Sequence, residues 1–428
     1  MPTESRRLGV QILLDVDGRG PTLGDRLAAP DVEALPPRDR AFLHELVLGT
    51  LRRRGAIDAA LAPLSTKPLS ELDAPVRAIL RLAAHQIVHL RVPDRAAVSE
   101  AVDLAKERAP RGSGFVNAVL RRLAREGPPA EPDPAREPLA WLTTAGSLPG
   151  WLAERWLGRL GAEAAVLRAR ALAAAPATTV RLNPRHPDAE ARALAAGLAL
   201  LPLTVPGALR VTAGRAHELA SAGLLLAQDE GSQLVAHLAA APGRTLDACA
   251  APGGKATLVA DLVGRDGLVF AGEIAPARLR TLAALTARWG APNVRVLAAD
   301  GLRPPYLGGF DTVLLDAPCS GLGTIARHPD IRWRVAPADL ARHARRQAGL
   351  LDSLAQVVRP GGRLVYATCS SEPEENDDVV ARFLERRRDF RVLPLPRWAE
   401  SFGDGPYART RPEVDGGDAF FAVLLGRA

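Results

Sequence analysis

The chain has 428 residues, more than one typical domain holds, and 47% of them are hydrophobic, as in folded globular proteins. The formal net charge of +7 favours a polyanionic partner such as a nucleic acid. No apolar run reaches the roughly 18 residues of a membrane span, and the N-terminus lacks a signal-peptide pattern, so we expect a cytoplasmic protein without membrane association. The sequence does not determine the oligomeric state, and a monomer is the expectation.

Apolar residues recur at helical spacing throughout the first 127 residues, and no alternating strand pattern intervenes. The predicted helices are Arg6–Asp17, Asp39–Arg54, Ala74–Leu90, Ala96–Glu107 and Gly114–Arg125. Residues 1–128 are therefore predicted to form an all-α domain. A linker rich in proline and acidic residues follows at 126–138 and marks a domain boundary.

Residues 139–235 mix short helical and strand patterns and are predicted to form a small α/β domain. From residue 236 to 428, short apolar runs alternate with helical segments: TLDACA, LVFAGEI, VRVLAAD, FDTVLLDAP, GRLVYATC, FRVLPL and AFFAVLLG. Such alternation predicts a doubly wound, mostly parallel sheet of the Rossmann-like kind. No helix separates the last two runs, so we expect an antiparallel finish at one edge.

The first of these strands runs into Ala251-Pro252-Gly253-Gly254-Lys255, directly before a helix. The glycines let the backbone approach a ligand closely, and the helix N-terminus can receive a carboxylate. Each of the first three strands also ends at an acidic residue; Glu273 can accept from ribose hydroxyls, and Asp300 can contact adenine. Because the pyrophosphate fingerprint G-x-G-x-x-G is absent, the pattern favours an adenosine ligand over a dinucleotide.

The three cysteines are odd in number, and their spacing fits neither a zinc site nor a disulfide framework. Cys319 follows the fourth strand, just after Asp316, and Cys369 follows the fifth, so both are expected at the ligand edge as candidate nucleophiles. Cys249 is expected to pack near the cofactor. A disulfide between Cys319 and Cys369 is not expected in a reducing compartment, and no metal site is predicted.

The motifs DACAAPGGKA, DAPCSGLG and YATCS, the last followed by SEPEEN, resemble those of the RNA (cytosine-C5)-methyltransferases. ARHPDIRWR at 326–334 and QDEGSQLVAHL at 228–238 resemble the RsmB/Sun (Fmu) family, which methylates 16S ribosomal RNA. The helical N-terminal region resembles a NusB-type RNA-binding domain. The resemblance covers nearly the whole chain. It implies a class I S-adenosylmethionine-dependent methyltransferase domain at 236–428, preceded by a small linking domain and a NusB-like domain.

The resemblance also implies roles for single residues. In the family, the cysteine of the TCS motif attacks cytosine, which corresponds to Cys369, and the cysteine of DAPCS assists product release, which corresponds to Cys319. Asp316 is expected to bind the base edge. Glu273 stands where many members have Asp, and its longer side chain still reaches a ribose. The expected S-adenosylmethionine contacts are Cys249, Ala250, Ala251, Pro252, Gly253, Gly254, Lys255, Glu273, Arg278, Asp300 and Asp316.

Candidate RNA contacts come from basic residues of the helical region and from one histidine, although charged helix faces are often merely solvated. They are Arg52, Arg53, Arg54, Arg121, Arg122, Arg125 and His328. His328 and Asp330 either line the base pocket or shape a loop, whereas Trp333 is expected to be a packing residue.

Three other functions compete with a ribosomal RNA methyltransferase. A DNA cytosine-C5 methyltransferase would use the Pro-Cys cysteine as its nucleophile, and the presence of Cys369 argues against it. Transfer RNA is an alternative substrate, since no base-reading code is visible in the sequence. A non-catalytic RNA-binding assembly factor is the third, but it would be expected to lack the nucleophile or the cofactor loop, and both are intact.

Overall fold

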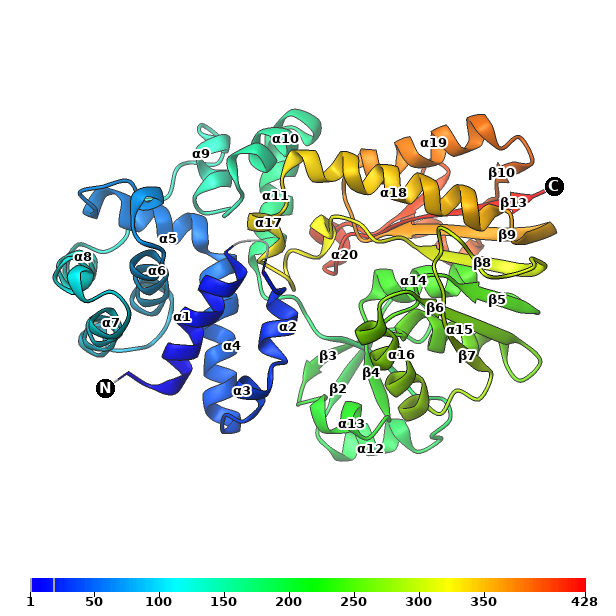
Figure 1. Cartoon of the computed structure of the whole chain (residues 1–428), viewed down its shortest axis with the longest axis horizontal. Helices are drawn as coiled ribbons and strands as arrows, with labels where there is room; N and C mark the ends of the chain where they lie inside the picture. The colour runs from blue at the N-terminus through cyan, green and yellow to red at the C-terminus, as the bar shows by residue number, and fades with distance from the viewer. Residues whose placement is uncertain (1, 18–19) are drawn as a thin grey trace. The chain divides into compact units, whose positions relative to one another are not determined.

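The computed structural model describes residues 2–17 and 20–428 (Figure 1). The chain divides into two compact units. Unit 1 comprises the chain up to Ala175 together with a segment from further along the sequence, Ile325–Val335, which we call the inserted segment. Unit 2 comprises Pro176–Thr324 and Ala336–Ala428. Within the described ranges, no helix is long and apolar enough to cross a membrane.

Unit 1 is helical. Its α-helices are α1 (Glu4–Val16), α2 (Leu23–Leu27), α3 (Pro30–Glu33), α4 (Pro37–Arg52), α5 (Arg54–Leu61), α6 (Ala74–His89), α7 (Asp94–Arg108), α8 (Ser113–Glu126), α9 (Pro138–Thr143), α10 (Gly150–Leu160), α11 (Ala162–Ala173) and, in the inserted segment, α17 (Ile331–Arg334). Helix α6 is central, since it packs against α1, α4, α5, α7 and α8. Its apolar residues are buried around most of its circumference, as expected for the middle helix of a bundle.

The predicted helices of this unit are present, with two differences. The stretch predicted as one helix from Asp39 to Arg54 is broken at Arg53, where α4 ends and α5 begins. The region expected as a separate linking domain at 139–235 is divided: α9, α10 and α11 pack on one another within unit 1, and the strands belong to unit 2. The structure therefore groups the chain into two units where the sequence suggested three domains.

The inserted segment is held in unit 1 by Arg332, whose side chain is fully buried. Its guanidinium donates hydrogen bonds to four backbone carbonyls, those of Arg52 (3.4 Å), Ser147 (3.2 Å), Leu172 (3.1 Å) and Ile325 (3.1 Å). Burial lowers the pKa of Arg332 to about 9, which leaves it charged at neutral pH. Carbonyl oxygens thus take the place of a carboxylate partner in stabilising the buried cation.

Two further side chains of the inserted segment contact the helical bundle. Trp333 donates from Nε1 to the carbonyl of Leu51 (2.8 Å), and the Arg54 guanidinium lies over its ring. Asp330 is buried and accepts from the backbone N–H of Leu23 (3.3 Å). Asp330 therefore helps to shape this segment, which is one of the two roles that the sequence suggested for it.

Unit 2 contains two sheets. The smaller one is antiparallel, in the order β2 (Ala199–Pro202), β3 (Leu209–Ala213), β1 (Thr179–Leu182), β4 (Leu225–Ala227), with α12 (Ala189–Ala195) and α13 (His217–Ser221) beside it in the sequence. The main sheet has the order β11 (Gly403–Asp404), β12 (Tyr407–Arg409), β13 (Phe421–Arg427), β9 (Val358–Thr368), β8 (Phe310–Asp316), β5 (Arg244–Asp247), β6 (Leu268–Glu273), β7 (Val294–Ala298), and β10 (Phe390–Val392) also pairs with β13.

The central strands of the main sheet are parallel, and β13 runs antiparallel to β9, as the sequence predicted. Helices cover both faces: α14 (Glu230–Ala239), α15 (Gly254–Val263) and α16 (Pro276–Trp289) on one, α18 (Pro337–Ala355) and α19 (Asp377–Arg386) on the other (Figure 1). The strand order reverses at β5, which lies between β6 and β8. Ligands of open α/β sheets bind at such a point, beyond the carboxyl ends of the strands.

Candidate active site

The loop between β5 and α15 carries the glycines that the sequence marked as a ligand cradle. Gly253 has φ of +116°, a conformation that L side chains rarely adopt. A Cβ atom there would also lie 3.0 Å from a methyl carbon of Leu282 and 3.2 Å from one of Leu285. Gly254 is the first residue of α15, whose opening turn has free N–H groups to offer a carboxylate.

Acidic side chains lie at or just after the carboxyl ends of the next two strands. Glu273 closes β6, is 4% exposed, and accepts from the backbone N–H of Ala275 (2.9 Å). Asp300 follows β7 and accepts from the N–H of Leu302 (2.9 Å). The structure thus places both acids at the edge where the sequence predicted them.

Arg278 on α16 braces this loop from the side. Its Nη2 donates to the carbonyl of Ala251 (2.7 Å), and its Nε lies 3.6 Å from a carboxylate oxygen of Glu273. Arg278, which the sequence predicted as a cofactor contact, therefore holds the loop at Ala251 and the side chain of Glu273 in place.

Asp247, the last residue of β5, is the member of this set that sequence reasoning undervalued. It is 1% exposed, and among the described residues neither carboxylate oxygen meets a donor in good hydrogen-bond geometry. Burial first, and then the charge of Asp316, raise its pKa to about 7, against smaller opposing effects of Lys255 and the Cys249 backbone. A buried carboxylate without a strong partner suits a ligand with a cationic group. The lack of donors around the Asp247 carboxylate results from tertiary packing, which cannot be predicted from the sequence alone.

The two candidate nucleophiles meet at the ends of neighbouring strands. Strands β8 and β9 are parallel, and Asp316 pairs with Ala367 at their carboxyl ends. This register brings the Sγ atoms of Cys319 and Cys369 to 3.3 Å, with both thiols free.

Lys255 and Asp316 form the ion pair of this site. Lys255 Nζ lies 2.7 Å from a carboxylate oxygen of Asp316. Burial alone would lower the pKa of Lys255, but the charge of Asp316, together with Cys369 and Asp247, raises it above its ordinary value. Lys255 therefore stays protonated, and it interacts electrostatically with Cys369 as well as with Asp316.

The other two thiols are held in the neutral form. Burial raises the pKa of Cys249 to about 12. The contact with Cys369, followed by burial, raises the pKa of Cys319 well above its ordinary value. Near neutral pH, neither group is a nucleophile comparable to an activated thiolate.

The candidate RNA contacts differ in exposure. Arg52 is 8% exposed and donates to the carbonyl of Ala326 (3.0 Å), so the structure corrects its assignment: its guanidinium stabilises unit 1. Arg54 is held between Asp17 (2.9 Å) and the ring of Trp333. The remaining candidates are exposed: Arg53, Arg121, Arg122, Arg125 and His328.

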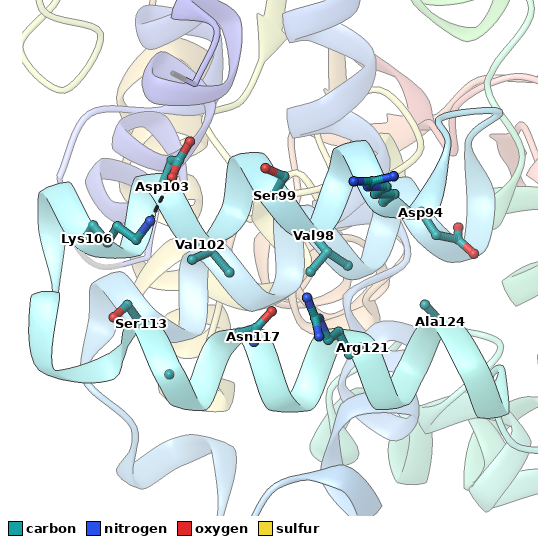
Figure 2. Close-up of a pocket in the computed structure, with 12 residues that line it drawn as sticks. Asp94, Val98, Ser99, Val102, Asp103, Lys106, Ser113, Asn117, Arg121 and Ala124 are labelled. Atoms are coloured by element: carbon teal, nitrogen blue, oxygen red, sulfur yellow. Dashed lines mark hydrogen bonds and ion pairs between the residues drawn. The ribbon is translucent and has the colours of Figure 1, made fainter.

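Figure 2 shows the groove between α7 and α8 that Arg121 lines. Arg95 and Lys106 add positive charge, and Asp94 and Asp103 add negative charge; Lys106 forms an ion pair with Asp103 (3.2 Å). The mixed signs make this groove a weaker attractant for phosphate than an all-basic surface would be.

The family is decided by comparison with known proteins. The model of the family described as 16S rRNA methyltransferase RsmB/F matches residues 235–426, and that of the NusB family matches residues 3–125. The chain is 37% identical over 428 residues to the ribosomal RNA small subunit methyltransferase B of Thermus thermophilus, covering 99% of this chain and 97% of that protein. The chain belongs to the RsmB/F family.

Other relatives of this RsmB/F-family protein agree. It is 35% identical over 440 residues to the ribosomal RNA small subunit methyltransferase B of Xanthomonas campestris, covering 99% of this chain and 97% of the relative. The crystal structure of PH0851 matches with a TM-score of 0.79 at 25% identity and covers 99% of both chains. The expected fold class is confirmed: a helical NusB domain and a methyltransferase domain that uses S-adenosylmethionine.

Proposed function

We propose that this RsmB/F-family protein methylates C5 of a cytosine in 16S ribosomal RNA, with Cys369 as the nucleophile and Cys319 as the residue that assists product release. One observation carries the proposal. The Sγ atoms of Cys319 and Cys369 lie 3.3 Å apart at the carboxyl ends of β8 and β9, beside the Lys255–Asp316 ion pair. Two thiols, one of them next to a cation, suit a reaction that needs one thiolate and one neutral thiol.

The reaction needs covalent help because C5 of cytosine is a poor nucleophile. The Cys369 thiolate adds to C6, forming an S–C6 bond and moving the C5–C6 electron pair to C5, which then accepts a methyl group. S-adenosylmethionine supplies that methyl group as an electrophilic sulfonium. S-adenosylhomocysteine is the leaving group of that transfer. A base then takes the remaining C5 proton, and the electron pair of the C5–H bond re-forms the C5–C6 double bond while the S–C6 bond breaks and releases the Cys369 thiolate.

The surrounding residues divide the other tasks. Asp316 is assigned to the base edge, where a carboxylate can accept from the exocyclic amine, and Lys255 balances its charge. The glycine loop from Gly253, with Glu273 and Asp300, is assigned to the cofactor. Since the base must reach the carboxyl ends of β8 and β9, the target nucleotide has to leave its stack.

The test is methyl transfer from labelled S-adenosylmethionine to unmethylated 16S ribosomal RNA. Cys369→Ala is expected to abolish transfer, because no other thiol replaces the nucleophile. Cys319→Ala is expected to trap a covalent protein–RNA adduct, because release is impaired. Cys249 lies outside the pair of thiols, so Cys249→Ala should not accumulate adduct, even where it weakens cofactor binding.

Full activity in Cys369→Ala with loss in Cys319→Ala would reverse the two roles and contradict the proposal. Labelling of transfer RNA in place of 16S ribosomal RNA would keep the chemistry and change the substrate. No labelling of either RNA would favour the non-catalytic assembly factor.

A further inference from the structure

One buried carboxylate touches the loops of both active-site cysteines. Glu375, in the short 3-10 helix Pro373–Glu375, is 0% exposed. Its Oε1 accepts from the backbone N–H of Ser320 (2.8 Å), and its Oε2 accepts from the hydroxyls of Ser320 (2.5 Å) and Ser370 (2.6 Å). Ser320 directly follows Cys319, and Ser370 directly follows Cys369. A single side chain therefore ties together the residues next to each thiol.

Neighbouring amides fix the same loops. Gln347 of α18 donates from Nε2 both to Glu375 Oε1 (3.1 Å) and to the carbonyl of Pro318 (3.1 Å). Asn376 donates to the carbonyl of Ser370 (2.9 Å). These contacts position Glu375 itself and restrict how far the cysteine loops can separate.

The hydrogen-bond donors that reach Glu375 in this network are neutral: a backbone N–H, two hydroxyls and an amide. Since no cation is among these donors, a carboxylate at this position opposes a further negative charge on the nearby thiols.

Cys319 faces several titratable groups. They are Cys369, Glu375, Asp316 and Tyr366, while His343 of α18 also faces Glu375, and Lys255 lies with Asp316. After the contact with Cys369 and burial, Glu375 is the next contributor that raises the pKa of Cys319, ahead of Asp316. A second thiolate beside Cys369 is therefore disfavoured.

We propose that Glu375 is a positioning residue of the methyl transfer reaction: its carboxylate holds the two cysteine loops together and keeps Cys319 a neutral thiol while Cys369 is the nucleophile. The inference rests on the proposed function for its catalytic meaning. Its effect on the thiols can be measured without RNA, so the two can fail separately.

The decisive variant is Glu375→Gln, which keeps the size and hydrogen-bonding capacity of the side chain and removes its charge. Alkylation of each cysteine by iodoacetamide is followed by peptide mass spectrometry from pH 6 to 10 in the full-length protein. We expect Cys319 to react about tenfold faster at pH 8, the effect of a pKa lower by one unit. Cys369 should change much less. Glu385→Gln, the same change at an exposed site on α19, is the control and should match wild type.

Methyl transfer supplies the second readout. Glu375→Gln is expected to lower kcat about tenfold with little change in KM for RNA, because the Glu375 side chain is fully buried. Ser370→Ala removes the hydrogen bond from Ser370 to Glu375 and leaves the Glu375 carboxyl group in place. It should therefore lower kcat while leaving the pH profile of Cys319 alkylation as in wild type, and it keeps the proposal testable if Glu375→Gln folds poorly.

An unchanged Cys319 profile in Glu375→Gln, with kcat within twofold of wild type, would overturn the inference. A shifted profile in a protein that methylates neither RNA would retain the effect on the thiols and refute the proposed function instead. If kcat falls only in parallel with the melting temperature in every variant, and alkylation does not change, Glu375 has a structural role only. This outcome would also overturn the inference.

Discussion

At the scale of single residues, Asp247 couples ligand binding to a proton. Its pKa is raised to about 7 by burial, from about 3.9 in an unfolded chain. In the ligand-free protein, its contribution to stability is therefore complete below about pH 4 and is lost as the pH rises through 7. A cationic group of a bound ligand would reverse this trend, because it would favour the carboxylate.

Binding of S-adenosylmethionine should consequently release a proton when the pH is below 7. We expect the affinity to weaken by up to tenfold for each pH unit below 7 and to level off above it, since the neutral carboxyl must first ionise. Calorimetric titration in two buffers of different ionisation enthalpy measures the release directly. Asp247→Asn should bind more weakly and lose this component, whereas equal proton release in wild type and variant at pH 6 would refute the assignment.

At the scale of elements, Arg332 joins pieces of unit 1 that are far apart in sequence. It donates to carbonyls at the end of α4, before α10 and in α11, so its loss leaves several buried acceptors without donors. Each such acceptor costs about 1–3 kcal/mol, part of which is offset because a buried charge is also removed. We expect Arg332→Met to lower the free energy of unfolding by about 3 kcal/mol in urea titrations.

Arg53→Met is the matched control for that measurement. Arg53 is exposed and immediately follows α4, so its replacement should change the free energy of unfolding by less than about 0.5 kcal/mol. Equal effects of the two substitutions would show that the carbonyl cluster contributes little to stability.

Features that depend on local sequence pattern were predicted, whereas features that depend on contacts between distant residues were not. Helical and strand periodicity, with strand-end acids and cysteines, predicted the helical bundle, the main sheet and the edge where Cys319 and Cys369 meet, since these depend on local pattern. Burial of Arg52 was not predictable, because its partner Ala326 lies 274 residues away. Glu375 stood in a recognised motif without a role, since its contact with Ser320 spans 55 residues. Short strands such as β11 and β12 were missed because two or three residues hold no alternation.

At the scale of the whole molecule, the net charge of +7 implies RNA affinity that depends on salt. Arg121 is exposed beside the α7–α8 groove, whereas Arg122 lies 3.0 Å from Glu126. Arg121→Gln should therefore weaken RNA binding severalfold and reduce the slope of log affinity against log salt by about 1, the loss of one phosphate contact. Arg122→Gln should have the smaller effect, because its charge is already partly neutralised.

Filter binding across a range of salt concentrations checks this prediction. Arg388→Gln is the control, an equal loss of charge at an exposed position of unit 2. Identical slopes for Arg121→Gln, Arg388→Gln and wild type would show that the groove residue makes no phosphate contact.

Because of the inserted segment, a single cut in the chain cannot separate the two units cleanly. The chain passes between the units after Ala175, after Thr324 and after Val335, so a single cleavage after Ala175 leaves residues 325–335 on the longer fragment. On that fragment Arg332 keeps the carbonyl of Ile325 but loses those of Arg52, Ser147 and Leu172, and Trp333 loses that of Leu51. The shorter fragment keeps these four acceptors without their donors. Two fragments of this kind resemble a split protein, in which one polypeptide completes the fold of the other. A version of unit 2 purified by truncation after Ala175 would carry the inserted segment without the helices that bind it.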